Sequence, residues 1–124
     1  MAHILLIDDD NLLRGLLRIN LEEAGYTVTE ARDGKEGLAL QAQSPADLVL
    51  TDLIMPEKEG VETIIELRKK HPKVKIIAMS GGGRGSATDY LQTARKLGAA
   101  RTLCKPFTDE ELLAAIQEVL GAPA

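Results

Sequence analysis

Short apolar runs alternate with longer amphipathic segments along the whole chain, and this alternation constrains the fold more than any other feature. The apolar runs have the length and composition of strands, which predicts strands at residues 3–7, 26–31, 47–51, 74–79 and 101–104. The segments between them carry apolar side chains at helical spacing. Strands that alternate with helices through short connections form a parallel sheet with helices on both faces, so we predict an α/β fold.

Local signals mark the ends of the predicted helices. Three tetrapeptides place a capping residue three positions before an acidic residue: DGKE (33–36), SATD (86–89) and TDEE (108–111). Gly25, Pro72 and Gly98 stand where helices are expected to end. The first helix carries a stripe of leucines that we expect to face the core: Leu12, Leu13, Leu16, Leu17 and Leu21.

Length and charge narrow the class of protein. A chain of 124 residues suits one domain, residues 1–124. The net charge of −4 and pI near 5.2 argue against direct binding of nucleic acid or an anionic membrane, and no apolar run approaches the thickness of a bilayer. The single cysteine, Cys104, excludes an internal disulfide and is expected to be a small buried strand residue. We therefore expect a cytoplasmic protein.

Polar side chains follow the predicted strands at the point where each strand ends. Asp8, Asp9 and Asp10 follow the first, while the third, fourth and fifth are followed by Asp52, Ser80 and Lys105. The second strand ends in Ala31 and Arg32, so it is expected at the margin of the sheet. Because function in an open parallel sheet gathers beyond the carboxyl ends of the strands, these residues predict a site there.

The chemistry of this predicted site points to a hard cation and to phosphorus. Clustered carboxylates, with no cysteine and with His3 and His71 placed away from the site, suit Mg²⁺. A carboxylate beside such a cation can act as a nucleophile toward phosphorus while a lysine and a hydroxyl neutralise the phosphoryl oxygens. Asp52 is the candidate nucleophile. Asp10 is interpreted as a helix N-cap.

Taken together, four motifs resemble the receiver domain of two-component response regulators, including its single-domain form in chemotaxis. They are IDDD with Asp8 and Asp9, LVLTDLIMPEKEG with Asp52, IIAMSG with Ser80, and CKPF with Lys105 and Pro106. The resemblance covers nearly the whole chain, and the motifs occur in order and at suitable spacing. It implies a flavodoxin-like, doubly wound, five-stranded parallel sheet of order 2-1-3-4-5.

The resemblance also implies a role for each site residue. Asp52 would accept a phosphoryl group from a histidine of a sensor kinase or of a histidine phosphotransfer protein. Mg²⁺ would be bound directly by Asp9, Asp52 and the backbone carbonyl of Ile54, and mainly through water by Asp8. Ser80 and Lys105 would contact phosphoryl oxygens, and the bond between Lys105 and Pro106 would be cis. The surface around residues 80–107 would then change for a downstream partner that the sequence does not identify.

The chain departs from the family pattern in the region that is expected to switch. Many receivers carry an aromatic residue three positions before the lysine, and here that position is Thr102, which offers a partner much less area to gain or lose. The segment after the fourth strand, SGGGRGSATDY, is rich in glycine and about three residues longer than is common. We interpret it as a flexible segment without a phosphate-binding motif.

Three functions remain open on the sequence alone. The leading hypothesis is a phospho-accepting switch that catalyses only its own phosphorylation and dephosphorylation and is therefore not an enzyme. A degenerate receiver that binds a partner without phosphorylation is the alternative, because Thr102 replaces the usual aromatic residue. An aspartate-nucleophile phosphatase of the haloacid dehalogenase type is disfavoured, since that family requires an aspartate where this chain has Ile54.

Overall fold

The computed structural model describes residues 2–53, 60–81, 92 and 94–121. Its elements alternate between strand and helix as the sequence predicts, and each predicted strand is found within two residues of its expected ends. In chain order they are β1 (His3–Ile7), α1 (Asn11–Glu23), β2 (Thr27–Ala31), α2 (Gly34–Gln43), β3 (Leu48–Asp52), α3 (Gly60–Lys70), β4 (Lys75–Gly81), β5 (Arg101–Lys105) and α5 (Asp109–Leu120).

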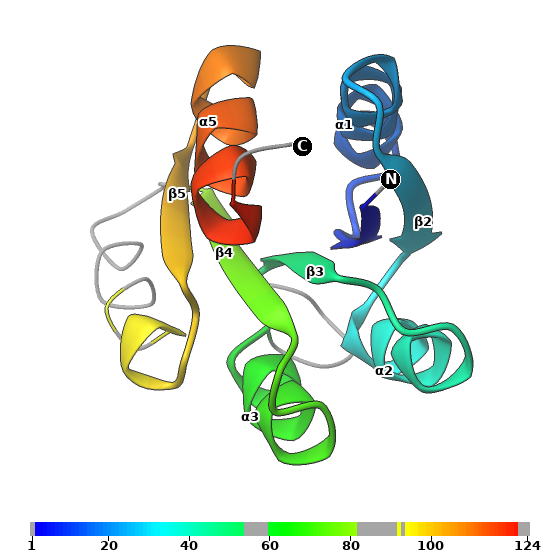
Figure 1. Cartoon of the computed structure of the whole chain (residues 1–124), viewed down its shortest axis with the longest axis vertical. Coiled ribbons are helices and arrows are strands. Elements are labelled where there is room, and N and C mark those ends of the chain that lie inside the picture. The colour runs from blue at the N-terminus through cyan, green and yellow to red at the C-terminus, as the bar shows by residue number, and fades with distance from the viewer. Residues whose placement is uncertain (1, 54–59, 82–91, 93, 122–124) are drawn as a thin grey trace.

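All five strands form one parallel sheet in the order β2-β1-β3-β4-β5. Helices α1 and α5 cover one face of the sheet, and α2 and α3 cover the other (Figure 1). This is the flavodoxin-like, doubly wound fold and the strand order that the resemblance implied. β2 lies at the margin, as expected from Ala31 and Arg32 at its end. β5 forms the opposite margin among the described strands.

Two hydrophobic layers hold the sheet between its helices. Side chains alternate between the faces of a strand, so Leu5 and Ile7 of β1 pack with α2 and α3, while Ile4 and Leu6 pack with α1 and α5. All of β3 is buried, as is typical of a central parallel strand that is covered on both faces. The central strands are therefore anchored along their length, and the site residues extend from their ends.

The predicted helix boundaries are largely confirmed. The side chains of Asp10, Asp33 and Thr108 cap α1, α2 and α5, and Thr108 forms a capping box with Glu111. Gly25 and Gly98 adopt positive φ angles of 102° and 117°, which a side chain would disfavour at a helix end. The predicted cap at 86–89 lies outside the described residues.

Two expectations about burial are wrong. In the leucine stripe of α1 only Leu17 and Leu21 are buried, whereas Leu12 is 75% exposed and Leu16 is 52% exposed, because the stripe is wider than the surface that the sheet and α5 offer. Cys104 is exposed and not buried, because β5 is a marginal strand and the site edge leaves this position open. None of the described helices is long and apolar enough to cross a bilayer.

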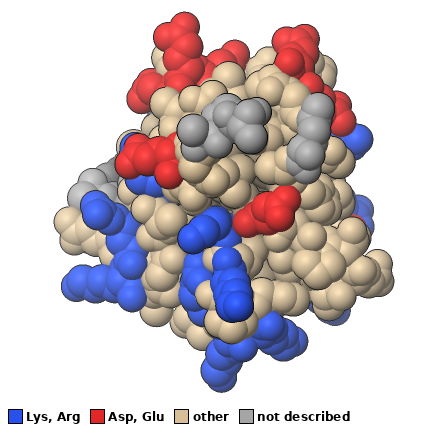
Figure 2. Space-filling view, viewed as in Figure 1, with Lys and Arg blue, Asp and Glu red and all other residues tan. Residues whose placement is uncertain are grey.

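Charged side chains are distributed unevenly over the surface. Acidic residues gather around α1 and α5, and basic residues gather around α3 (Figure 2). Six exposed cations on and near α3 and the start of β4, here called the α3–β4 basic group, are Lys69, Lys70, Lys73, Lys75, Arg95 and Lys96. Within the described part of the chain, none of the six forms an ion pair. The surface therefore has an acidic region and a basic region despite the modest net charge of the chain.

Candidate functional site

The carboxyl edge of the sheet brings the predicted site residues to one place. Asp8 and Asp9 follow β1, and Asp52, Ser80 and Lys105 lie within the last two residues of β3, β4 and β5. The strands were predicted to stop just before these three residues, but each continues through its site residue. Parallel pairing with neighbouring strands therefore fixes the backbone at Asp52, Ser80 and Lys105.

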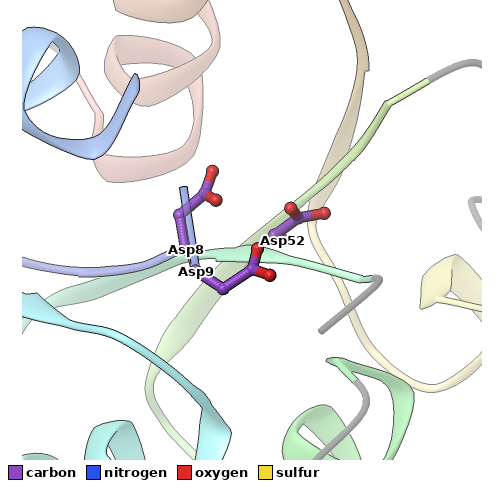
Figure 3. Close-up of side chains that lie close together, drawn as sticks. All are labelled: Asp8, Asp9 and Asp52. Atoms are coloured by element: carbon purple, nitrogen blue, oxygen red, sulfur yellow. The ribbon is translucent and has the colours of Figure 1, made fainter. Parts of the chain in front are cut away.

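Three carboxylates form the centre of the site. One oxygen from each of Asp8, Asp9 and Asp52 lies within 4.8 Å of the others. Figure 3 shows the side chain of Asp9 extending toward Asp52 at the end of β3, with Asp8 beside them. Asp8 is fully buried and Asp52 is 6% exposed, while Asp9 is open to solvent. Like charges at this separation repel, so the arrangement requires a cation.

Lys105 supplies one positive charge to this group. Its Nζ lies 3.0 Å from Asp8 Oδ2 and 3.2 Å from Asp52 Oδ2. Burial by itself would lower the pKa of the ammonium, but the charges of Asp52 and Asp8 outweigh burial and hold the pKa above its ordinary value. Lys105 therefore remains charged at neutral pH. The peptide bond from Lys105 to Pro106 is cis, as the resemblance implied.

The turn between β1 and α1 holds Asp8 in place. The backbone N–H of Asp10 donates to Asp8 Oδ1 at 2.9 Å, and the N–H of Asp8 donates to the carbonyl of Ala31 at 3.1 Å. The side chain of Asp10 accepts from the N–H of Leu13 and caps α1, which confirms its interpretation as an N-cap. The three consecutive aspartates thus have different roles. Asp10 caps the helix, and Asp8 and Asp9 face the site.

Ser80 is a buried hydroxyl at the same edge. It is fully buried, and its Oγ has no hydrogen-bond partner within the described part of the chain. Thr102 pairs with Ala78 in the register of β4 and β5, so Ser80 and Thr102 lie on the same face of the sheet. A buried hydroxyl without a partner is costly, and a negatively charged oxygen bound in the site would be an acceptor for it.

Sequence reasoning missed an ion network that contacts the site from α1. Arg14 Nη1 donates to the carbonyl of Asp8 at 2.7 Å, and Arg14 Nε lies 2.9 Å from Glu30 Oε1. The second oxygen of Glu30 pairs with Arg18 at 2.8 Å. The available signal was two arginines four positions apart on α1 and a glutamate on β2, the strand that packs beside that helix.

The donor set fits a hard divalent cation. The metal-binding group found among the described residues consists of carboxylates alone, without sulfur or imidazole, and oxygen ligands are what Mg²⁺ prefers. Asp8, Asp9 and Asp52 are the residues that would hold it. The backbone carbonyl of Ile54, expected as a further ligand, and residues 82–90 of the glycine-rich segment lie outside the described residues.

Comparison with known proteins agrees with this geometry. The family model described as response regulator receiver domain matches residues 4–117. The transcriptional regulatory protein CpxR of Klebsiella pneumoniae is 42% identical over 120 residues, covering 97% of this chain and 50% of CpxR. The DNA-binding dual master transcriptional regulator RpaA of Synechocystis is 38% identical, covering 97% of this chain and 49% of RpaA. The chain thus spans about half the length of these curated relatives.

Solved structures agree with the family match. A CheY-like receiver domain protein from Methanospirillum hungatei superposes with a TM-score of 0.88 at 30% identity, covering 97% of this chain and 94% of that one. Chemotaxis protein CheY4 of Vibrio cholerae superposes with a TM-score of 0.86 at 31% identity, covering 97% and 99%. With the family model matched over residues 4–117 and these neighbours alike in fold and extent, the chain belongs to the response regulator receiver domain family.

Proposed function

We propose that this receiver domain is a phosphorylation switch in which Asp52 accepts a phosphoryl group from a histidine of a sensor kinase or of a histidine phosphotransfer protein. The observation that carries the proposal is the position of Asp52. Its carboxylate is almost fully buried at the end of β3, within reach of two further carboxylates and of the Lys105 ammonium. A structural aspartate would not need two acidic neighbours at this distance.

The transfer requires one bond to form and one to break. An oxygen of the Asp52 carboxylate attacks the phosphorus of a phosphohistidine, and an O–P bond forms as the N–P bond breaks. The electron pair of the broken bond leaves with the imidazole, which takes a proton from solvent. Lys105 then contacts one phosphoryl oxygen, and the hydroxyl of Ser80 donates to another.

A bound Mg²⁺ would neutralise the charge of the phosphoryl oxygens. Two of the carboxylates that would bind it are held in position by neighbouring residues. Asp8 and Asp52 are oriented by Lys105, and Asp8 also by the backbone of Asp10. Because a phosphoryl group adds negative charge to three carboxylates, transfer without a divalent cation should be very slow.

A groove beside the site suits a phosphodonor that presents an apolar surface. It lies between α1 and the segment that follows β5, has a volume of about 340 Å³, and is lined in part by Leu16, Lys105 and Phe107. Leu16 in its lining is exposed, and so are Leu12 and Ile19 on the same helix. A donor protein packed on these side chains would lie at the same edge of the molecule as Asp52, which supports a protein as the donor.

The output of the switch would involve Ser80 and Thr102. Binding of a phosphoryl oxygen by Ser80 would pull on the end of β4, and Thr102 lies on the same face of the neighbouring strand. We propose that the surface around residues 80–107 changes for a downstream protein partner. Because Thr102 is smaller than the aromatic residue of many receivers, the area that it gains or loses is small.

The test is the intact mass of the protein after incubation with acetyl phosphate, with and without Mg²⁺. We expect wild type to gain one phosphoryl group only with Mg²⁺, and Asp52→Asn to gain none. Asp10→Asn is the matched control, because it changes an acidic residue of the same edge that keeps its capping role and faces away from the site. No gain by wild type under either condition would overturn the proposal and favour the phosphate-independent binding module.

A further inference from the structure

The three carboxylates of the site are anchored unequally. Asp8 is held by the N–H of Asp10 and by Lys105, and Asp52 is held by Lys105. Asp9 is exposed, and within the described part of the chain its side chain makes neither a hydrogen bond nor an ion pair. The place from which the Asp9 carboxylate extends is therefore set by the backbone that carries it.

That backbone is fixed from α1 by Arg14. The carbonyl of Asp8 belongs to the peptide group that joins Asp8 to Asp9, and Arg14 Nη1 donates to it at 2.7 Å. A hydrogen bond to this carbonyl restrains the plane of the peptide, which places the Cα of Asp9 and the N–Cα bond about which its side chain is oriented. The side chain of Arg14 is only 11% exposed, so it has little freedom to leave this contact.

Arg14 is itself held in place from β2. Its Nε lies 2.9 Å from Glu30 Oε1, and the other oxygen of Glu30 accepts from Arg18 at 2.8 Å. The hydrogen bond from Arg18, together with that from Arg14, lowers the pKa of Glu30, so the carboxylate remains charged at neutral pH. A planar guanidinium that donates in two directions is suited to this bridging position, whereas an ammonium is not.

We propose that Arg14 is a positioning residue for the cation site, which fixes the Asp8–Asp9 peptide so that the Asp9 carboxylate points toward Asp52. The inference rests on the proposed function, because it concerns the same cation. It assigns a role to a residue that contributes no ligand. Arg14 has two opposite effects on binding of the cation. Its positive charge by itself would repel the cation, whereas its orientation of Asp9 would strengthen binding.

These opposite signs make the inference testable by direct binding of Mn²⁺, measured from the electron paramagnetic resonance signal of the free ion. Positioning predicts that Arg14→Gln weakens Mn²⁺ binding by about tenfold, the lower end of the effect of residues that orient metal ligands. Arg14→Lys keeps the charge but not the planar geometry and should also weaken binding. Loss of a repelling charge alone predicts tighter binding for Arg14→Gln.

Arg18→Gln is the matched control. Arg18 pairs with the same Glu30 and lies one turn along α1, but it does not contact the turn from Asp8 to Asp10. We expect Arg18→Gln to bind Mn²⁺ within about twofold of wild type, since it removes an exposed charge without moving Asp9. In phosphorylation by acetyl phosphate, the rate of Arg14→Gln should approach that of wild type at saturating Mg²⁺, because excess cation compensates for weak binding.

Each outcome decides the inference. Unchanged or tighter Mn²⁺ binding by Arg14→Gln would overturn it, as would equal weakening by Arg14→Gln and Arg18→Gln, which would indicate a merely structural network. If Arg14→Gln is unfolded in a thermal melt, Arg14→Lys supplies the comparison. Failure of wild type to bind Mn²⁺ would instead overturn the proposed cation site, and with it the inference.

Discussion

Two groups of basic side chains in this molecule differ in their ion pairing and in their exposure to solvent. Near the site, Arg14 and Arg18 pair with Glu30, and Lys105 pairs with Asp8 and Asp52. On the other face of the sheet, the α3–β4 basic group is exposed and, among the described residues, without ion pairs. The cations of the first group form ion pairs with residues of the fold, whereas those of the second group are solvated.

The difference indicates that the pairing and burial of a basic side chain, and not the number of basic side chains, determine its contribution to stability and to the site. Arg14 and Arg18 lie one turn apart on α1 and face Glu30 across the contact between α1 and β2. Lys69 and Lys70 at the end of α3 have no acidic residue in the last turn of their helix, and the helix dipole favours positive charge there. The following predictions test this contrast, in order of decreasing effect.

Removal of Lys105 should have the largest effect on stability. Lys105→Met removes the ammonium that pairs with the buried carboxylates of Asp8 and Asp52, which should lower the free energy of unfolding by about 3 kcal/mol in metal-free buffer. Added Mg²⁺ should restore part of the loss, because it supplies the missing charge. Urea denaturation with and without Mg²⁺ measures both effects.

Lys35→Met is the control for this variant, since Lys35 is exposed on α2 and has no ion pair among the described residues. It should change the free energy of unfolding by less than about 0.5 kcal/mol. Equal losses from the two substitutions would show that Lys105 is no more important to stability than a solvated lysine.

Replacement of Glu30 should have a smaller effect that depends on pH. Hydrogen bonds from Arg18 and Arg14 lower the pKa of Glu30 in the folded state, so the charged carboxylate stabilises the fold at pH values above its unfolded pKa. Glu30→Gln should therefore be less stable than wild type by about 1 kcal/mol at pH 7.

The difference between wild type and Glu30→Gln should stay constant down to about pH 4.3, the ordinary pKa of a glutamate, and shrink as the pH falls through the lowered pKa of the folded state. Denaturation curves of both proteins at several pH values between 7 and 3 measure it. A difference that grows on acidification would contradict the assigned direction of the pKa shift.

Neutralisation of part of the α3–β4 basic group should have the smallest effect. The double variant Lys73→Gln and Lys75→Gln should change the free energy of unfolding by no more than about 0.5 kcal/mol, as is usual for surface positions, and should be phosphorylated at the rate of wild type. Stability and acetyl phosphate assays check this. A large loss in either assay would remove the distinction between the two groups of cations.

The sequence predicted the sheet and the edge of the sheet that holds the site, because both follow from local patterns. Apolar periodicity located each of the strands that the structure describes, and the residues at the strand ends meet wherever parallel strands share a sheet. Boundaries were less exact, because apolar composition does not reveal that Asp52 and Ser80 still pair with neighbouring strands.

What the sequence did not reveal depends on contacts between distant segments. The exposure of Leu12 and Cys104 follows from how much surface the neighbouring elements offer, which no local pattern encodes. The bridge from Glu30 through Arg14 to Asp8 joins β2, α1 and the site, and each of these residues taken alone is typical of a solvated surface. Pairing across the fold is what distinguishes them.

The marginal position of β5 has a consequence for association between molecules. A strand with one neighbour presents unpaired backbone groups and is a template for aggregation. β5 is only five residues long, and the cations at its two ends are paired within the molecule, Arg101 with Glu118 and Lys105 with Asp8 and Asp52. The shortness of β5 thus limits the number of backbone hydrogen bonds that edge-to-edge growth could form at the side of the sheet nearest the switch residues.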